Sequence, residues 1–472
     1  MGLLIKNGTI VSSTAEYQAD LLIEDEKIKE IAVNIPEGDH EVVDAAGKYI
    51  FPGGVDEHVH MGPFDSYGFE TSHAALVGGT TTIVDFAPQD QGDTVINSFH
   101  RHKDEKAKGI ASPDFSFHGM VMDTSEALLD EIPKMVENGI VNLKFFMAYN
   151  GTPFHVEDDL IFKAMQICKD YGITPWVHCE NGDMIEVLKE EAVKNGVTKP
   201  IGHYLSSPPT VEDEAVQRLI YLAKLADCPV FIVHNTTAGA CENIKRAQDQ
   251  GQPVYGETCT HYLTIDTSFL EKENFEGAKW VCGPAIRPKE HLEAVWKAVK
   301  DGTLMGIGSD HAACVGGFEK AKKRGIDDFT KIPNGVPGMQ DRLNMVWTQG
   351  VEKGRINRQD FVRLCMENPA KVCGIYPQKG ALLPGSDADV LIWDPNYEGT
   401  ISVENSYEGT DYNTFEGFPQ KGIADKVFLR GHLMAERGKL VGEKARGNML
   451  SHSLIPYVTA IIIQKRRNKK AS

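Results

Sequence analysis

The chain has 472 residues, of which 41% are hydrophobic and 25% charged, a composition typical of a globular protein with a large core. Its formal net charge of −18 argues against nucleic acid as a partner, because phosphate would be repelled. No uninterrupted apolar run approaches the roughly 18 residues of a membrane span. The nine cysteines contain no Cys-x-x-Cys pair, which indicates reduced thiols and a cytoplasmic protein.

Short β-strands are predicted at the N-terminus, over residues 3–6, 20–24 and 27–32, where apolar residues alternate or run together. From about Val55 the pattern changes to apolar runs that alternate with helical segments. These runs predict strands at residues 80–86, 115–121, 141–147, 174–178, 230–234, 254–257 and 304–309. The intervening helices are predicted at residues 125–137, 158–171, 213–225, 239–250 and 291–301. Strand–helix alternation repeated about eight times over roughly 320 residues is typical of an α/β protein with a (β/α)8 barrel of the TIM type.

β character returns after Gly374, with strands expected at residues 390–393 and 426–430. We expect the two chain ends to meet in one small β-sandwich domain beside the barrel. The predicted division is residues 1–54 and 375–446 for the β-domain, 55–374 for the barrel and 447–472 for a C-terminal tail. The tail has ten mostly apolar residues, 454–463, before a basic end. This stretch is too short to cross a bilayer, so we expect it to pack on its own or a neighbouring subunit.

Histidine and aspartate stand where four of the predicted barrel strands end. His58 and His60 form a His-x-His at the end of the first strand, where side chains at i and i+2 share a face. His178, His234 and Asp310 end three further strands. Because active sites of such barrels lie at the C-terminal ends of the strands, we expect these five side chains to converge. Histidine and carboxylate are ligands that suit zinc and similar divalent ions.

A lysine is predicted inside the strand at residues 141–147, which is otherwise apolar apart from Asn142. Burying an ammonium is unfavourable and lowers its pKa, so Lys144 is expected to present a neutral, nucleophilic amine. Such an amine can take up carbon dioxide to form a carbamate, an anion able to bridge two cations. The alternative is a lysine that extends from the strand end to a surface carboxylate.

From about residue 3 to 446 the sequence resembles the hydantoinase/dihydropyrimidinase family of cyclic amidohydrolases. The resemblance is carried by short motifs spread over the chain: residues 51–56 (Phe-Pro-Gly-Gly-Val-Asp), 78–82, 143–149 (Leu-Lys-Phe-Phe-Met-Ala-Tyr), 177–182, 255–259, 308–311 (Gly-Ser-Asp-His), 328–335 and 411–417 (Asp-Tyr-Asn-Thr-Phe-Glu-Gly). It implies hydrolytic ring opening of cyclic amides, namely dihydropyrimidines and 5-substituted hydantoins, to N-carbamoyl amino acids. It also implies a homotetramer.

The resemblance further implies a metal centre with two divalent cations, most simply zinc, with manganese or cobalt as alternatives. Its ligands would be His58, His60 and Asp310 for the first ion, His178 and His234 for the second, and carboxylated Lys144 for both. A hydroxide that bridges the two ions would attack the ring carbonyl, and Asp310 would carry its proton to the leaving nitrogen.

The substrate contacts implied by the resemblance are Tyr149, which would hydrogen-bond the developing oxyanion, and Asn334 with the backbone at Gly283, which would hold the amide edge of the ring. The chain departs from the family pattern at residues 61–70 and 312–324. The first of these segments is expected to face the exocyclic group of the substrate through an apolar wall formed by Met61, Phe64, Tyr67 and Phe69.

Three alternatives remain open. Residues 257–262 (Glu-Thr-Cys-Thr-His-Tyr) and the short segment after His60 are also compatible with an allantoinase. A dihydroorotase would need a cation for the substrate carboxylate, and residues 61–72 contain no Lys or Arg. A non-catalytic scaffold similar to the neuronal dihydropyrimidinase-like proteins would lack metal ligands, whereas all six ligand positions are filled here.

Overall fold

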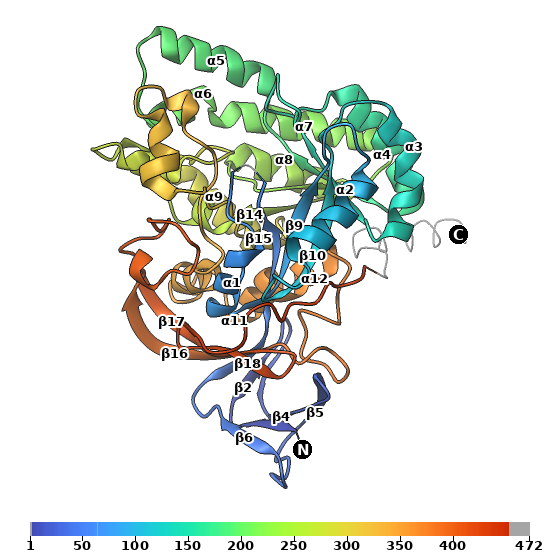
Figure 1. Ribbon diagram of the computed structural model, residues 1–472, viewed down its shortest axis with the longest axis vertical. Coiled ribbons are helices and arrows are strands. Elements are labelled where there is room, and N and C mark those ends of the chain that lie inside the picture. Colours follow the sequence, from blue (N-terminus) through green and yellow to red (C-terminus); the bar gives the residue numbers. More distant parts are fainter. Residues whose placement is uncertain (1, 64, 453–472) are drawn as a thin grey trace.

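The computed structural model describes residues 2–63 and 65–452 and has two parts, a barrel surrounded by helices and a β-layer at one end (Figure 1). The predicted apolar stretch at residues 454–463 and the basic residues after it lie outside the described residues. Within the described ranges, no helix combines the length and apolar character that a bilayer crossing requires.

Eight parallel strands form the barrel, and each pairs with the next along the chain. They are β8 (Gly54–Val59), β9 (Thr80–Pro88), β10 (Asp114–Met120), β11 (Asn142–Phe146), β12 (Thr174–His178), β13 (Val230–Ile232), β14 (Val254–Cys259) and β15 (Gly306–Gly308). The end of the barrel returns to its beginning, because the N–H of His60 donates to the carbonyl of His311 at 2.7 Å. The predicted (β/α)8 barrel is confirmed.

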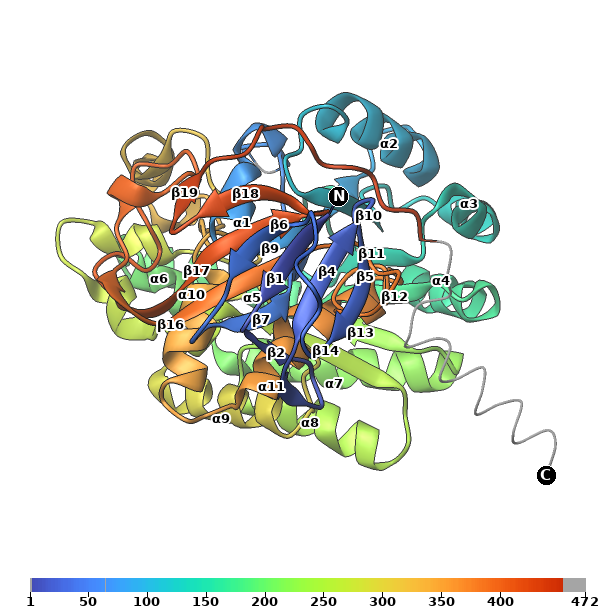
Figure 2. The same cartoon turned by 90° about the horizontal axis from the view of Figure 1, so that it is seen from below.

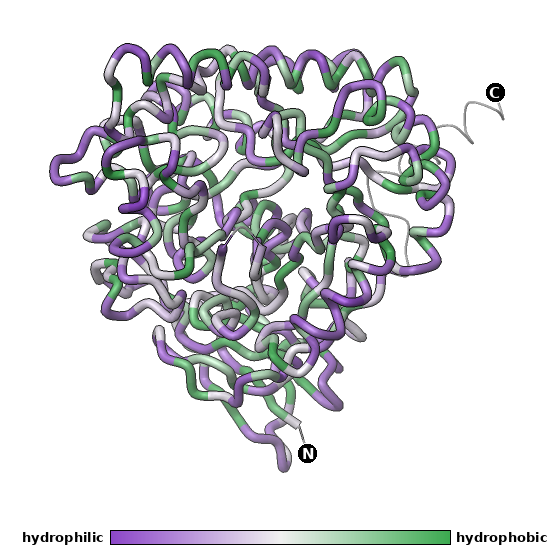
Figure 3. The backbone as a smooth tube through the Cα atoms, turned by 45° about the horizontal axis from the view of Figure 1, so that its top comes forward, coloured by the Kyte–Doolittle hydropathy of each residue, from purple (hydrophilic) through white to green (hydrophobic). Residues whose placement is uncertain are grey.

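The helices lie around this barrel, and their turns alternate between hydrophilic and hydrophobic, as expected of helices with one face on a core (Figures 1 and 3). They are α1 (His73–Val77), α2 (Val95–Arg101), α3 (Ala127–Met135), α4 (Asp158–Tyr171), α5 (Gly182–Lys194), α6 (Ile201–Ser206), α7 (Pro209–Ala226), α8 (Ala238–Asp249), α9 (Lys289–Lys300), α10 (Arg342–Val346), α11 (Arg358–Val362) and α12 (Asn368–Val372).

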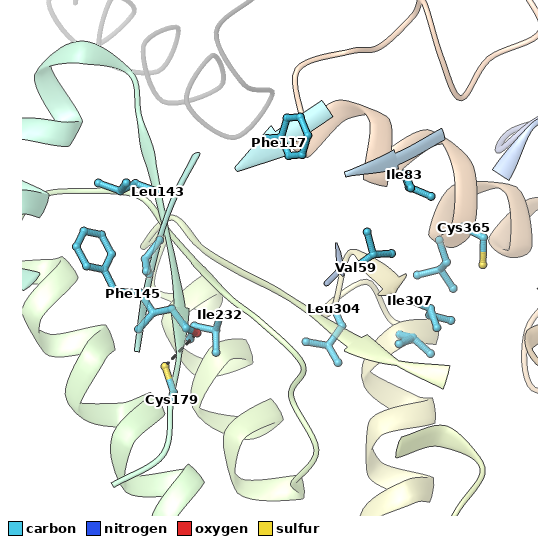
Figure 4. Close-up of a cluster of buried hydrophobic side chains, with 14 of the residues drawn as sticks. Val59, Ile83, Phe117, Leu143, Phe145, Cys179, Ile232, Leu304, Ile307 and Cys365 are labelled. Carbon is cyan, nitrogen blue, oxygen red and sulfur yellow. Dashed lines mark hydrogen bonds between the residues drawn. The ribbon is translucent and has the colours of Figure 1, made fainter. Parts of the chain in front are cut away.

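Side chains of the barrel strands alternate between the helices and the barrel interior. In β11, Leu143 and Phe145 pack in the large cluster shared with the helices (Figure 4), whereas Lys144 between them has the opposite orientation. The interior is filled by aromatic rings, among which Trp176 and Phe231 stack with their centroids 4.0 Å apart. The barrel is therefore a packed core that closes the space beneath the strand ends.

Both chain ends build the β-layer. A four-stranded sheet has the order β5-β4-β1-β6, and a seven-stranded sheet has the order β19-β18-β17-β16-β7-β2-β3. Their bounds are β1 (Leu3–Lys6), β2 (Thr9–Val11), β3 (Glu16–Gln18), β4 (Asp20–Glu24), β5 (Lys27–Ala32), β6 (Glu41–Asp44), β7 (Tyr49–Pro52), β16 (Val390–Thr400), β17 (Pro419–Leu429), β18 (His432–Glu436) and β19 (Lys439–Leu440). Apolar side chains from both sheets share one core, and Figure 2 shows the four-stranded sheet seen from below. The predicted β-sandwich of both chain ends is confirmed.

A buried ionic cluster joins this sandwich to the barrel. The Lys379 ammonium lies 2.5 Å from the Asp114 carboxylate, 2.8 Å from Asp389 and 3.1 Å from Asp387. Asp114 also pairs with Arg430. Because Asp114 begins β10, the cluster lies at the N-terminal end of the barrel strands, where residues contribute to stability rather than to the active site.

Candidate metal centre

Three side chains converge where β8 and β15 end. Oδ1 of Asp310 lies 3.2 Å from Nε2 of His58 and 3.2 Å from Nε2 of His60. One ligand atom from each residue lies within 4.8 Å of the others. Two imidazole nitrogens and a carboxylate oxygen this close together can converge on one divalent ion.

His178, at the end of β12, and His234, shortly after β13, form a second group. Nδ1 of His178 lies 2.9 Å from Nε2 of His234, and the His234 ring is 5.5 Å from the ring of His58, so the two groups border one centre. Burial lowers the pKa of both imidazoles, and the neighbouring His178 lowers the pKa of His234 further. Both rings are therefore neutral near pH 7 and can offer a lone pair to a metal ion.

Lys144 lines the cavity that these groups border. Its side chain has no exposed surface, and within the described residues its Nζ makes no hydrogen bond and lies 4.9 Å from the centre of the Phe86 ring. The alternative of a lysine that reaches a surface carboxylate is therefore wrong. Burial lowers the pKa of Lys144 from 10.5 to about 8. A buried polar group without a partner costs about 1–3 kcal/mol, so this amine indicates a group that the polypeptide alone does not supply.

Two buried glutamates, whose roles the sequence did not predict, hold the histidines from behind. Glu180 accepts a hydrogen bond from Nε2 of His178 at 2.8 Å, and Glu257 contacts Nδ1 of His58. The pKa of Glu180 is lowered to about 2, where the neighbouring His178 outweighs the effect of burial, so Glu180 is an ionised carboxylate that only accepts. Nε2 of His178 therefore carries the proton, and its inner nitrogen Nδ1 keeps a lone pair. Glu180 could have been found from its position two residues after His178, but Glu257 comes from a different strand and only the fold reveals its contact.

Three of the predicted site residues have left-handed backbone conformations: φ is 66° at Tyr149, 37° at His234 and 47° at Asp310. Such angles are unfavourable outside glycine and cluster at functional sites. Strands β13 and β15 accordingly end at Ile232 and Gly308, earlier than the sequence predicted, because the chain turns out of the extended conformation to place the His234 and Asp310 side chains.

A cavity of about 510 Å³ lies over these groups. It is lined by five of the six predicted metal ligands, His60, Lys144, His178, His234 and Asp310. The sixth, His58, is fully buried beneath them.

The three predicted substrate contacts also line this cavity. A Cβ atom added to Gly283 would lie 2.5 Å from the hydroxyl oxygen of Tyr149 and 3.5 Å from the side-chain nitrogen of Asn334, so the three groups are adjacent. Burial raises the pKa of Tyr149, which keeps its phenol protonated and able to donate.

Residues 49–434 match the sequence pattern of the amidohydrolase family. The chain belongs to this family. It is 42% identical over 460 residues to a D-hydantoinase of Geobacillus stearothermophilus, covering 95% of this chain and 96% of that protein. The crystal structure of a dihydropyrimidinase from Brevibacillus agri NCHU1002 superposes with a TM-score of 0.92 at 40% identity, covering 96% of this chain and 98% of the other. An L-hydantoinase (dihydropyrimidinase) from Arthrobacter aurescens gives a TM-score of 0.87 at 32% identity, with 95% and 99% coverage. The chain is thus a hydrolytic enzyme of the hydantoinase/dihydropyrimidinase group, as the sequence motifs predicted.

One prediction about the cavity of this amidohydrolase is wrong. Met61 and Phe69 are buried and line a separate cavity of about 390 Å³. The hydroxyl oxygen of Tyr67 accepts a hydrogen bond from the backbone N–H of Gly316. Phe64 lies outside the described residues. The apolar lining of the active cavity instead comes from other segments, namely Phe146, Phe154, Cys282 and Ala312. Among the described residues of the loop after His60, Met61 and Phe69 therefore turn away from the active cavity, which residue type alone did not reveal.

Proposed function

We propose that this amidohydrolase opens the rings of dihydropyrimidines and 5-substituted hydantoins by hydrolysing a ring amide bond, which yields N-carbamoyl amino acids. The observation that carries the proposal is the buried Lys144 amine, without a hydrogen bond in the described residues, beside four histidines and Asp310 at the base of one cavity. The names of the relatives, hydantoinase and dihydropyrimidinase, support this substrate class.

The donor set fits two divalent cations. We assign its six side chains as His58, His60 and Asp310 for one ion, His178 and His234 for the other, and Lys144 for both. Two adjacent cations repel each other, and four neutral imidazoles do not offset their charge. The centre therefore needs an anion besides Asp310. The neutral amine of Lys144 would supply it by adding carbon dioxide and releasing a proton, which leaves a carbamate with two oxygens. Zinc suits these nitrogen and oxygen donors, as do manganese and cobalt.

Such ions, when bound, supply a hydroxide near neutral pH and a Lewis acid for the ring carbonyl. The chain itself moves the proton. Burial raises the pKa of Asp310, but the neighbouring His58 and His60 lower it by more. The pKa therefore lies well below its usual value, and the carboxylate is ionised. Asp310 lines the cavity and is 11% exposed. It can accept the proton of the attacking water and return it to the ring nitrogen that leaves.

Substrate contacts are assigned to the neighbouring polar groups of the cavity wall. The protonated phenol of Tyr149 donates to the oxygen on which charge develops, a contact worth about 10²–10³-fold in kcat at comparable sites. Asn334 and the backbone at Gly283 hold the amide edge of the ring, since both adjoin Tyr149.

Neutral rings suit this cavity better than anionic ones. Among the described residues that line it, Lys144 is the only Lys or Arg, and Asp65 adds a carboxylate. The carboxylate of dihydroorotate would therefore remain unpaired, and an unpaired buried charge is strongly unfavourable.

The function is tested by measuring kcat/KM of the zinc-, manganese- and cobalt-loaded enzyme on dihydrouracil, several 5-substituted hydantoins, allantoin and dihydroorotate. We expect a hydantoin or dihydrouracil to be the best substrate and dihydroorotate to be poor. A higher kcat/KM on allantoin or dihydroorotate than on every hydantoin and dihydropyrimidine would contradict the proposal.

We also propose that the enzyme is a homotetramer. Helices α5, α6 and α7 lie together and expose large apolar side chains, namely Met184, Val187, Leu205, Tyr221 and Leu225. Large apolar side chains left exposed on neighbouring helices are typical of subunit contacts. Light scattering coupled to size-exclusion chromatography gives the mass directly, and a monomer or a dimer would contradict the assignment.

The nine free, buried cysteines support a reducing compartment such as the cytoplasm.

A further inference from the structure

Lys322 is a buried lysine that the metal centre does not use. Its side chain has no exposed surface, and its Nζ donates to three backbone carbonyls, those of Val281 at 2.8 Å, Pro333 at 2.8 Å and Gly335 at 2.7 Å. An ammonium has three N–H donors, so each donor has a carbonyl. Hydrogen bonds from a charged donor are shorter and stronger than neutral ones. The lysine therefore holds these three carbonyls at fixed distances from one atom.

The three carbonyls belong to the two segments that carry the assigned ring contacts. Val281 precedes Gly283 by two residues, and Pro333 and Gly335 stand on either side of Asn334. The two segments also meet directly, because the N–H of Gly335 donates to the carbonyl of Val281 at 3.2 Å. A side chain from a third segment thus joins the two segments by three hydrogen bonds, in addition to this single direct one.

The turn that carries Lys322 is itself held in place. It follows the π-helical turn Gly317–Ala321, and the Asp411 carboxylate accepts two backbone N–H groups of that turn at 2.6 and 3.1 Å. Nearby, the indole N–H of Trp280 donates to the carbonyl of Thr414 at 2.9 Å. Residues 411–417, a motif of the sequence that the reaction itself does not use, therefore support both Lys322 and the segment that leads to Gly283.

We propose that Lys322 is a positioning residue that sets the ring-binding edge of the cavity by fixing the backbone on both sides of Asn334 and just before Gly283. This inference rests on the proposed function for its substrate. The ring contacts act in the ground state as well as the transition state, so their displacement raises KM more than it lowers kcat. A displacement of about 1 Å in a positioned group can reduce kcat/KM by about 10²-fold.

The test compares Lys322→Met with Lys379→Met. Both substitutions remove the ammonium of a buried lysine and keep most of the aliphatic stem, but Lys379 lies at the junction with the β-sandwich, at the opposite end of the barrel strands. With unsubstituted hydantoin, whose binding depends on the ring edge, we expect Lys322→Met to raise KM at least about tenfold with a bound-metal content equal to wild type. Lys379→Met should lower the Tm and leave KM unchanged.

Hydrogen exchange supplies a readout that needs no substrate. In Lys322→Met, peptides that contain residues 281–283 and 333–337 should exchange faster than in wild type, whereas Lys379→Met should leave these peptides protected. If the wild type opens no cyclic amide, the proposed function fails, and hydrogen exchange alone then tests Lys322. Wild-type KM together with wild-type exchange in Lys322→Met would overturn the inference.

If Lys322→Met does not fold, Lys322→Gln carries the same test, because its shorter carboxamide keeps a donor that cannot serve three carbonyls. If neither variant folds, Lys322 contributes to global stability rather than to local positioning, and the inference is likewise overturned.

Discussion

The imidazoles of His178 and His234 face each other at the base of the cavity, with Nδ1 of the first 2.9 Å from Nε2 of the second. The outer nitrogen of His178 is bonded to Glu180, so its inner nitrogen presents a lone pair. Nδ1 of His234 has no hydrogen bond within the described residues. The proton of the neutral His234 ring can therefore reside on Nδ1, which leaves Nε2 with a second lone pair that faces the first. A cation is the natural occupant of the space between two such lone pairs.

Metal removal should therefore abolish activity. Exhaustive chelation is expected to reduce hydantoin opening to the background rate, because the enzyme loses both its nucleophile and its Lewis acid. Zinc, manganese or cobalt should restore turnover, and titration should reach its maximum near two ions per chain. Full activity in protein shown to be metal-free would be incompatible with this account.

Glu180→Gln should weaken metal binding without removing a ligand. An amide in place of the carboxylate can face the ring nitrogen of His178 with either its oxygen or its nitrogen, so the tautomer that points a lone pair inward is no longer enforced. Loss of such a partner typically reduces metal affinity by about 10–100-fold. Glu186→Gln on helix α5 removes a charge from a surface ion pair and is the matched control. Equal metal affinity in the two variants, measured by competition with a chelator, would argue against the role of Glu180.

Gly283→Ala should inactivate the enzyme while the fold persists. The added Cβ would lie 2.5 Å from the hydroxyl oxygen of Tyr149, closer than real Cβ contacts, so the phenol would have to move from its place beside the ring. Gly338→Ala is the control, because a Cβ there meets only the Ser309 carbonyl oxygen at 3.8 Å, an ordinary contact. We expect a loss of about 10²-fold or more in kcat for Gly283→Ala and near wild-type kinetics for Gly338→Ala, with similar melting temperatures. Equal kinetics in both would refute the placement of Tyr149.

Reactivation of the metal-free enzyme should depend on pH through Lys144. Only the neutral amine adds carbon dioxide, and its pKa is lowered to about 8 by burial. At a constant concentration of dissolved carbon dioxide and metal, the recovery rate should rise about tenfold per pH unit below pH 8 and level off above it. A rate that keeps rising to pH 10 would indicate a lysine with its ordinary pKa and contradict the effect of burial.

Much of the barrel could be predicted because its elements are bounded by local signals. Helix α4 and strand β12 have the predicted bounds, and Gly172 between them is left-handed with φ of 78°, as expected of a glycine that ends a helix. The ends of β13 and β15 could not be predicted, because His234 and Asp310 adopt left-handed angles that their residue types do not announce.

The proposed histidine and aspartate ligands were apparent in the sequence because they lie near strand ends, which the barrel brings together. Lys144 was apparent because it interrupts an otherwise mostly apolar strand. The remaining parts of the site depend on contacts between distant segments. Glu257 contacts His58 across strands, and Lys322 joins carbonyls about 10 and 40 residues away in the sequence. The prediction that Met61 and Phe69 form a wall of the active cavity was wrong because the path of an irregular loop carries no periodic signal.

The measurement that tests the account most directly is the activity and metal content of Lys144→Ala with and without a short carboxylic acid. The substitution removes the amine that we propose carries the bridging carbamate and leaves a space above Phe86 in an otherwise intact barrel. We predict folded protein that has lost the dinuclear centre and most of its hydantoin-opening activity, and partial recovery of both when acetate or propionate is added with excess metal. Wild-type rates from Lys144→Ala without added acid, or an unmodified Lys144 in fully active, metal-loaded wild-type enzyme, would contradict the central claim.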